Sequence, residues 1–184
     1  MKQVIFGMAG HPAAGKSTFA KKLVKEFNAS HINKDDFRDF FAENILDYKG
    51  ADKSYSNEKI LSVNRVVRVA SDKLIEELYS RGVSFIVDGY GKFKESRERM
   101  RQFFKEKKIN LPIIIIHVVE DKDVILERLK ERDSGGNTKW VENFKIKWEP
   151  GFSKPSEEEC DFFVEVNKYN HEDAIEKIRN FVNS

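Results

Sequence analysis

The segment Gly10–Ser17, "GHPAAGKS", matches the phosphate-binding pattern G-x-x-x-x-G-K-[ST] at every defined position. Glycines at both ends let the backbone turn so that its N–H groups point inward at phosphate oxygens, and a helix that begins near Ser17 adds the positive end of its dipole. Lys16 would then reach the β and γ phosphates, while the Ser17 hydroxyl would bind Mg²⁺. The residues predicted to bind a nucleotide are Gly10, His11, Pro12, Ala13, Ala14, Gly15, Lys16, Ser17 and Thr18.

The sequence around this segment supports a phosphate loop rather than an ordinary glycine turn with a surface lysine. A short apolar run precedes it and a helical pattern follows, which is the context that the motif requires. Similar apolar runs predict strands at Gln3–Met8, Ser30–Asn33, Val83–Asp88, Ile113–Val119 and Asp161–Val166. Apolar residues spaced three or four apart predict helices at Ser17–Phe27, Asn57–Arg81, Glu95–Lys107, Lys122–Arg132 and Glu172–Phe181.

The alternation of these strands and helices predicts βαβ units, in which the strands are parallel and apolar on both faces. The expected fold is an α/β domain of three layers, with a five-stranded parallel sheet flanked by helices. In such sheets, ligands bind at the carboxyl ends of the strands. The phosphate loop follows the first strand and would lie at that edge.

The composition is that of one domain, residues 1–184, without a strong overall charge. The chain has 33 Lys and Arg against 31 Asp and Glu, a net charge of +2, so no global field requires a nucleic acid or a membrane as partner. Its single cysteine cannot form an internal disulfide, which favours a reducing, cytoplasmic location. The most apolar other stretch, Leu111–Val119, is far shorter than the roughly 20 residues that span a bilayer, so we expect no membrane association.

Two polar stretches, Asp47–Lys59 and Arg132–Trp140, are predicted to be loops. The Gly135-Gly136 pair would allow the second loop to hinge. Because mobile loops beside a ligand site are often lids, we expect a small lid near residues 132–148.

A second functional element is predicted at Asp88, which ends the apolar strand "FIVD". Alone, this residue could be an ordinary strand-terminating Asp before a turn. Beside an intact phosphate loop, a carboxylate in this place orients Mg²⁺ directly or through water. We therefore predict that Ser17 and Asp88 are the metal ligands, and the position of Asp88 also makes it a candidate substrate-binding residue.

The stretch Ile32–Arg38, "INKDDFR", permits two interpretations. Its letters Asn33-Lys34-Asp35-Asp36 fit the N-K-x-D pattern by which GTP-binding proteins recognise guanine. In those proteins the pattern follows a late strand, far from the phosphate loop, whereas here only one helix separates the two. A carboxylate in this place can instead accept a proton from an attacking hydroxyl, and Arg38, one turn later, can bind an anionic or polar part of an acceptor.

The motifs "GHPAAGKST" and "INKDDFR" together resemble those of the polynucleotide-kinase-like group of small P-loop kinases, which share an adenylate-kinase-type fold with zeta toxins and chloramphenicol phosphotransferases. This resemblance covers most of the chain. It implies a P-loop NTPase fold with a small lid, ATP as the phosphoryl donor and Mg²⁺ as the cofactor. It also implies that Asp35 is the general base and that Arg38 binds a substrate phosphate. A lid arginine on the nucleotide phosphates is expected as well, with Arg132 as the catalytic candidate and Arg128, one turn earlier, as a nucleotide-binding one.

Each of these roles has a structural alternative. Asp35 or Asp36 could cap the helix that follows. Arg128 and Arg132 lie four residues apart and are interleaved with two glutamates, so either arginine could form a solvated ion pair instead.

The acceptor is the part of the reaction that the sequence defines least. The stretch Lys92–Lys108 carries eight basic residues and three acidic ones, an excess that could face an anionic acceptor such as a nucleic-acid backbone or a phosphorylated metabolite. Arg97 is the candidate substrate-binding residue within it. The alternative is that this excess forms the solvated outer face of a helix whose apolar residues point inward.

We therefore expect an ATP-dependent kinase that transfers the γ-phosphoryl group to a hydroxyl, on a polynucleotide 5′ end or on a small molecule, with Mg²⁺ and with Asp35 as base. Two alternatives remain: a nucleotide-binding or slow NTPase module that acts through a protein partner, and a zeta-toxin-like kinase of nucleotide sugars. Asp35 with Arg38 favours direct transfer, because an NTPase switch would need a water-positioning residue rather than an acceptor pocket.

Overall fold

A computed structural model describes residues 1–44, 58–88, 91, 93–134 and 139–184 of the chain. Within them, five parallel strands form one sheet in the order β2-β3-β1-β4-β5. The strands are β1 (Ile5–Ala9), β2 (Ser30–Asn33), β3 (Phe85–Asp88), β4 (Ile113–Val118) and β5 (Phe162–Val166). The predicted α/β fold with a five-stranded parallel sheet is confirmed.

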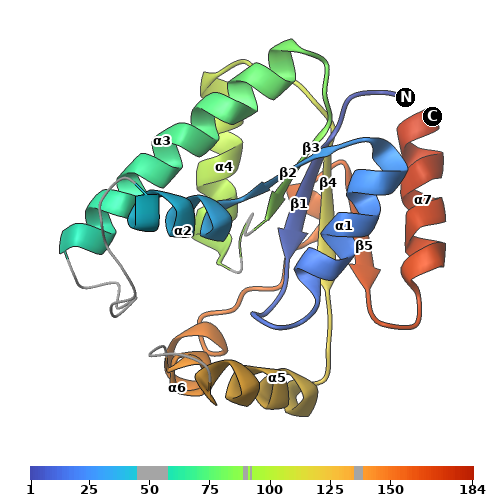
Figure 1. The fold of residues 1–184 in the computed structure, drawn as a ribbon. Helices are drawn as coiled ribbons and strands as arrows, with labels where there is room; N and C mark the ends of the chain where they lie inside the picture. Colours follow the sequence, from blue (N-terminus) through green and yellow to red (C-terminus); the bar gives the residue numbers. More distant parts are fainter. Residues whose placement is uncertain (45–57, 89–90, 92, 135–138) are drawn as a thin grey trace.

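Helices cover both faces of the sheet, so the domain has three layers (Figure 1). The α-helices are α1 (Lys16–Phe27), α2 (Lys34–Asn44), α3 (Glu58–Ser80), α4 (Lys94–Glu106), α5 (Lys122–Ser134), α6 (Trp140–Asn143) and α7 (His171–Asn183). A π-helix at Phe144–Trp148 continues α6, and a 3-10 helix spans Glu157–Glu159. α1 and α7 lie on one face and α3 and α4 on the other, while α5 and α6 lie beyond the carboxyl ends of the strands.

The central strand β1 supplies side chains to two separate cores, as the two-residue period of a strand requires. Phe6 and Met8 belong to a core that includes residues of α1, α5 and α7. Ile5 and Ala9 belong to a second core with residues of α3 and α4. All five residues of β1 are buried. The phosphate loop therefore starts from the most firmly packed strand of the sheet.

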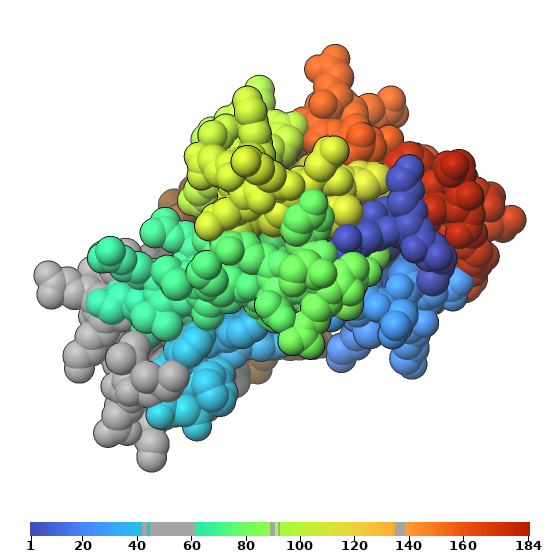
Figure 2. Space-filling model, turned by 90° about the horizontal axis from the view of Figure 1, so that it is seen from above, coloured from blue at the N-terminus to red at the C-terminus, as the bar shows by residue number. Residues whose placement is uncertain are grey.

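Both chain ends lie at the edge of the sheet opposite the phosphate loop (Figure 1). Seen from above, the N-terminal residues lie between α3 and α7 (Figure 2). The carboxyl ends of the strands, where ligands bind in such sheets, are thus free of both termini. In the part of the chain that the structure describes, no helix is long and apolar enough to cross a bilayer.

The predicted strand and helix ranges agree with the structure to within two residues at each end that is described. Three segments differ. The helix α2 has no counterpart among the predicted ranges, residues 132–134 continue α5 instead of starting a loop, and Trp140 begins α6. The predicted Gly135-Gly136 hinge and residues 47–57 of the other predicted loop lie outside the described residues.

The helix α6 begins early because a side chain of α5 caps it. Asp133 accepts hydrogen bonds from the backbone N–H groups of Trp140, at 2.5 Å, and Val141, at 3.1 Å. A carboxylate that accepts from the first N–H groups of a helix stabilises its start. This contact connects α5 to α6 directly.

Candidate active site

The phosphate loop joins β1 to α1 at the carboxyl edge of the sheet (Figure 1). Lys16, the first residue of α1, turns its side chain back over this loop. Its Nζ donates hydrogen bonds to the carbonyl oxygens of Gly10, at 3.1 Å, and His11, at 2.8 Å. The ammonium group is therefore held above the loop before any nucleotide binds.

Charged groups from three other elements surround Lys16. Burial lowers the pKa of Lys16, and this effect is the largest. Asp88 of β3 and Asp35 of α2 act in the opposite direction, whereas Arg132 of α5 lowers the pKa further. All three must lie within electrostatic range of Lys16 to do so. The structure thus brings together four residues that the sequence singles out.

At Gly10 the loop passes so close to β4 that no side chain fits. Its φ is 132°, and an added Cβ would lie 2.4 Å from the carbonyl oxygen of Val118, the last residue of β4. That distance is far below any normal non-bonded contact. The packing of the loop against β4 therefore requires glycine at the first position of the motif.

We expect Gly10→Ala to lower the free energy of unfolding by about 1–3 kcal/mol, because the backbone must leave a conformation that only glycine adopts readily and must move away from Val118. Urea denaturation of the protein without nucleotide would measure this loss. Gly82→Ala is the matched control, since Gly82 also has a positive φ, 70°, but has no atom within 4 Å of its Cβ position. Equal losses in the two variants would contradict a role for the contact with Val118.

Asp88 lies beside Ser17 and His31 at the end of β3. The Ser17 hydroxyl donates a hydrogen bond of 3.2 Å to Asp88 Oδ2, and His31 Nε2 lies 3.5 Å from the same oxygen. Burial raises the pKa of Asp88, but the contact with His31, the charge of Lys16 and the bond from Ser17 outweigh it, so that the pKa is lowered overall. Asp88 is therefore held as a carboxylate at neutral pH.

The hydroxyl of Ser17 and the carboxylate of Asp88 fit a magnesium ion. Both are hard oxygen ligands, and Mg²⁺ in such sites usually takes one or two protein oxygens together with substrate phosphates and water. Within the described residues, no group of three or more His, Cys, Asp or Glu side chains could hold a metal ion by itself. A magnesium ion at Ser17 and Asp88 would thus depend on the bound nucleotide.

Asp35 lies in the first turn of α2 with its side chain 76% exposed. Its backbone N–H donates to Asn33 Oδ1 at 3.1 Å, so Asn33 supplies the cap of this helix end and the Asp35 carboxylate is left for other contacts. That carboxylate forms an ion pair with Arg38, whose Nε donates to Asn64 Oδ1 of α3 at 2.8 Å. The contacts orient Asp35 and Arg38 together.

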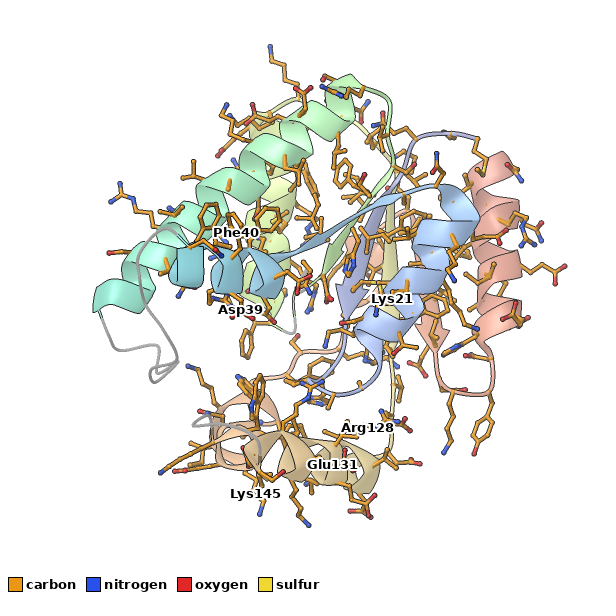
Figure 3. The ribbon with its side chains drawn as sticks, viewed as in Figure 1. Lys21, Asp39, Phe40, Arg128, Glu131 and Lys145 are labelled. Carbon is orange, nitrogen blue, oxygen red and sulfur yellow. The ribbon has the colours of Figure 1, made fainter. Side chains whose placement is uncertain are left out.

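Arg128 extends from α5 to the phosphate loop. One of its Nη atoms donates to the carbonyl oxygen of Ala13 at 2.8 Å, and the other pairs with Glu120 at 3.0 Å. The guanidinium of Arg128 thus contacts the loop and the residue two positions after β4; the alternative, an ion pair with a glutamate of its own helix, is not seen among the described residues. Figure 3 shows Arg128 on α5 and Asp39 on α2, on opposite sides of the strand ends.

Arg132 lies one turn beyond Arg128 and packs on an aromatic ring. Its guanidinium carbon is 5.4 Å from the centre of the Trp140 ring, within the range of a cation–π interaction. The Trp140 ring in turn lies 5.6 Å from that of Trp148. Arg132 is thus positioned by α5 and by the aromatic pair of α6 and the π-helix.

The structure does not support Arg97 as a substrate-binding residue. Its side chain has no exposed surface and forms an ion pair of 2.6 Å with Glu159. The excess of basic residues in Lys92–Lys108 suggested contact with an anionic acceptor, but this guanidinium points inward and is fully engaged by protein groups. We therefore withdraw Arg97 from the substrate ligands.

Four residues of the site have no counterpart among the predicted ones. They are His31 beside Asp88, Asn33 at the start of α2, Asn64 beside Arg38, and Glu120 beside Arg128. His31 and Asn33 lie in a strand aligned in parallel with β3, where Asn33 is opposite Asp88. That alignment would have pointed to these two residues, whereas no sequence pattern marks Asn64 or Glu120.

Comparison with known proteins shows the family to which the chain belongs. A family model described as "AAA domain" matches residues 5–143. The adenylate kinase of Thermoanaerobacter sp. (strain X514) is 30% identical over 127 residues, which cover 68% of this chain and 57% of that protein. The adenylate kinase of Bartonella tribocorum is 29% identical over 126 residues, covering 68% and 64% respectively. The match thus spans less than two thirds of these relatives.

Solved structures share the fold at low sequence identity. A candidate kinase from Chloroflexus aurantiacus has a TM-score of 0.74 and 17% identity, covering 100% of this chain and 98% of that one. A sugar kinase from Janibacter sp. HTCC2649 has a TM-score of 0.59 and 13% identity, covering 98% and 95%. These likenesses establish the adenylate-kinase-like fold, and they leave the substrate open.

Proposed function

The chain belongs to the AAA domain family and has the adenylate-kinase-like fold of P-loop kinases, and from this premise we propose that it transfers the γ-phosphoryl group of ATP to a hydroxyl acceptor. The residues proposed to act are distributed on two sides of the strand ends. The phosphate loop, α5 and α6 form the nucleotide side, and the start of α2 forms the acceptor side (Figure 3).

The observation that carries the proposal is the placement of Asp35. Its carboxylate is largely exposed, is paired with Arg38 and lies within electrostatic range of Lys16. Lys16 marks where the β and γ phosphates would lie. A carboxylate near the γ phosphate can accept the proton of an attacking group.

The need for a base favours a hydroxyl over a phosphate as the acceptor. A phosphate oxygen is already ionised at neutral pH and attacks without losing a proton, so a carboxylate beside it would only repel it. A hydroxyl must lose its proton as the new bond forms. Asp35 in this position therefore supports an alcohol group as acceptor.

The nucleotide side supplies cations for the transferred group. Lys16 would contact the β and γ phosphates, with Ser17 and Asp88 holding Mg²⁺ against them. Mg²⁺, when bound, neutralises charge that develops on the phosphate oxygens. Arg132 would approach the same oxygens from α5, and Arg128 would support the loop at Ala13.

The acceptor itself is proposed to be anionic. Burial lowers the pKa of Lys34, at the start of α2; Asp72 opposes this, whereas Arg99, Arg68 and Arg38 lower the pKa further. These cations come from α2, α3 and α4 and lie within electrostatic range of Lys34, and the carboxylate of Asp72 acts against them. Phosphorylated acceptors, including a nucleic-acid end, would be attracted to such a group.

The test is transfer of labelled γ-phosphate from ATP with Mg²⁺ to a panel of acceptors. The panel would contain 5′-hydroxyl DNA and RNA, nucleosides, nucleoside monophosphates, nucleotide sugars and aminoalcohol antibiotics. We expect label on a hydroxyl of one anionic class. Label on the phosphate of the monophosphates, which gives nucleoside diphosphates, would contradict the hydroxyl acceptor, and label on nucleotide sugars would favour the zeta-toxin-like activity. Label released only as free phosphate would favour the NTPase module.

A further inference from the structure

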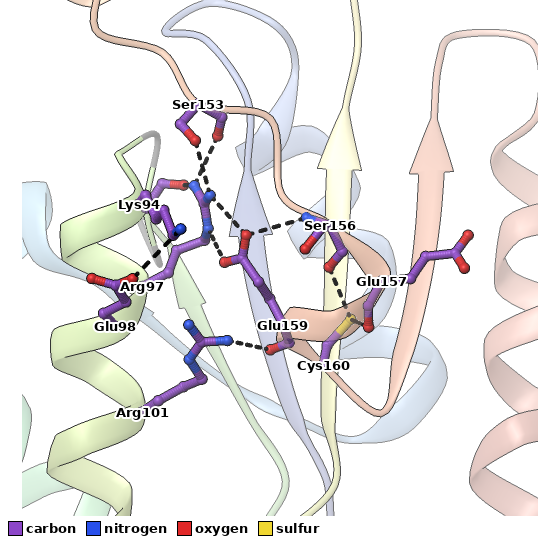
Figure 4. Close-up of polar contacts among 10 residues, drawn as sticks. Lys94, Arg97, Glu98, Arg101, Ser153, Ser156, Glu157, Glu159 and Cys160 are labelled. Carbon is purple, nitrogen blue, oxygen red and sulfur yellow. Dashed lines mark hydrogen bonds and ion pairs between the residues drawn. The ribbon is translucent and has the colours of Figure 1, made fainter.

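Arg97 on α4 makes five hydrogen bonds in the interior. Nε and Nη2 donate to the two carboxylate oxygens of Glu159, at 2.6 and 3.1 Å. Nη1 donates to the carbonyl oxygens of Ser153, at 2.8 Å, and Gly91, at 3.1 Å, and Nη2 also donates to the Ser153 hydroxyl at 3.3 Å. Figure 4 shows the guanidinium between Ser153 and Glu159. All the donor capacity of the side chain is thus used by three separate parts of the chain.

Burying the charges of Arg97 and Glu159 in this arrangement costs free energy, which suggests that the arrangement has a specific role. A buried ion pair carries a large desolvation cost, and apolar residues of the same volume often stabilise a fold equally well. An arginine, however, fixes several acceptors in one plane at defined distances, which neither a lysine nor an apolar side chain can do. We therefore consider which of the hydrogen-bond acceptors of Arg97 has a position that matters for the site.

The two neighbours of Ser153, Phe152 and Lys154, contact different elements. The Phe152 ring lies 4.3 Å from the ring of His11 in the phosphate loop and 5.6 Å from the ring of His117 in β4. Lys154 forms an ion pair of 2.7 Å with Glu165 of β5. Between these two residues, the backbone carbonyl and the hydroxyl of Ser153 both accept hydrogen bonds from Arg97.

We propose that Arg97 is a positioning residue for the phosphate loop. By fixing Ser153, it keeps the neighbouring Phe152 ring packed on His11, and so holds the loop in the shape that binds phosphates. Its bond to Gly91, three residues after Asp88, also fixes the chain that follows β3. This inference rests on the proposed binding of ATP by the loop, and it is independent of the acceptor.

The proposal is tested by titrating ADP, with and without Mg²⁺, into the wild-type protein and the variants Arg97→Lys, Phe152→Ala and the double variant by calorimetry. Because Arg97 acts through Phe152, we expect each single variant to raise the Kd for ADP roughly tenfold, and the double variant to raise it no further. Phe152 is only half-buried, so its truncation should leave the fold intact even if Arg97→Lys does not.

Arg179→Met is the control for loss of an ion pair. Arg179 joins α7 to Glu26 of α1 on the surface, at 2.5 Å, and its variant should bind ADP like the wild type. Unchanged ADP affinity in Phe152→Ala, or a thermal midpoint that falls in Arg97→Lys while ADP affinity stays unchanged, would make Arg97 a purely structural residue. Effects that multiply in the double variant would show that the two residues act separately and would also overturn the proposal.

The same titration separates this inference from the proposed function. Failure of the wild-type protein to bind ADP at all would contradict the nucleotide site itself. Normal wild-type binding without transfer to any acceptor would contradict the kinase and leave the expected effect of Arg97 on binding in place.

Discussion

Asp35→Asn is expected to slow transfer of the γ-phosphoryl group by about 10²- to 10⁴-fold, the usual contribution of a general base. The amide keeps the size of the carboxylate and can still accept a hydrogen bond from Arg38, but it cannot take up a proton at neutral pH. ATP affinity should change little, because Asp35 lies on the acceptor side and Lys16 and the loop are untouched. Single-turnover transfer to the acceptor found in the panel would measure the rate separately from product release.

Asp36→Asn is the matched control for this substitution. Asp36 is the next residue in the same first turn of α2 and is also exposed, so both variants remove one negative charge from the same helix end. Since the side chain of Asp36 is directed away from that of Asp35 by the turn of the helix, its loss should leave transfer nearly unchanged. Equal rates for the two variants, whether fast or slow, would remove Asp35 from the role of base.

Much of the fold could be predicted because its strands are buried on both faces. Runs such as "IIIIHV" in β4 are apolar at every position except His117, and a parallel sheet between two helical layers is the arrangement that buries them. The range of the helix α2 was not predicted, for the opposite reason. Its sequence, "KDDFRDFFAEN", is mostly polar, and aromatic residues such as Phe37 are only partly buried against the core. Its apolar stripe is therefore too short to give a helical pattern.

The nucleotide side of the site could be predicted because its residues follow strands directly. The phosphate loop and Asp88 follow or end neighbouring strands, β1 and β3, and parallel alignment brings such ends together. The prediction that Arg97 binds substrate was wrong. A charged side chain is expected to be exposed unless a buried partner for it is known. Its partner, Glu159, is 62 positions away in the sequence, and the segment that carries it reaches α4 only through the path of the chain after the π-helix.

Arg128 was predicted to lie near the nucleotide, but the residues that its guanidinium contacts could not be predicted. Glutamates on the same helix were the alternative partners. The guanidinium instead reaches Ala13 and Glu120, because α5 lies across the end of the phosphate loop rather than along the surface. Only the packing of α5 against the loop distinguishes these alternatives.

Lys16→Met is expected to reduce transfer by about 10²- to 10³-fold or more, since removing one preorganised donor to a developing oxyanion already has that effect. Methionine keeps the length of the side chain without its charge. Because burial disfavours the charged form of Lys16, the apolar side chain of methionine should not lower the midpoint of thermal unfolding. The variant should instead lose the rise in thermal midpoint that ATP and Mg²⁺ give to the wild type through binding to the folded state.

Lys21→Met provides the matched control for this change, because Lys21 lies on the same helix, α1, with its side chain exposed (Figure 3). It should keep both transfer and the ATP-dependent rise in thermal midpoint. A Lys16 variant that retained full transfer would contradict the phosphate loop as the donor site, despite its match to the motif. Loss of transfer with an unchanged ATP-dependent rise would instead show that Lys16 acts on the moving phosphoryl group and not in binding the nucleotide, because the stabilisation measures only the ground-state complex.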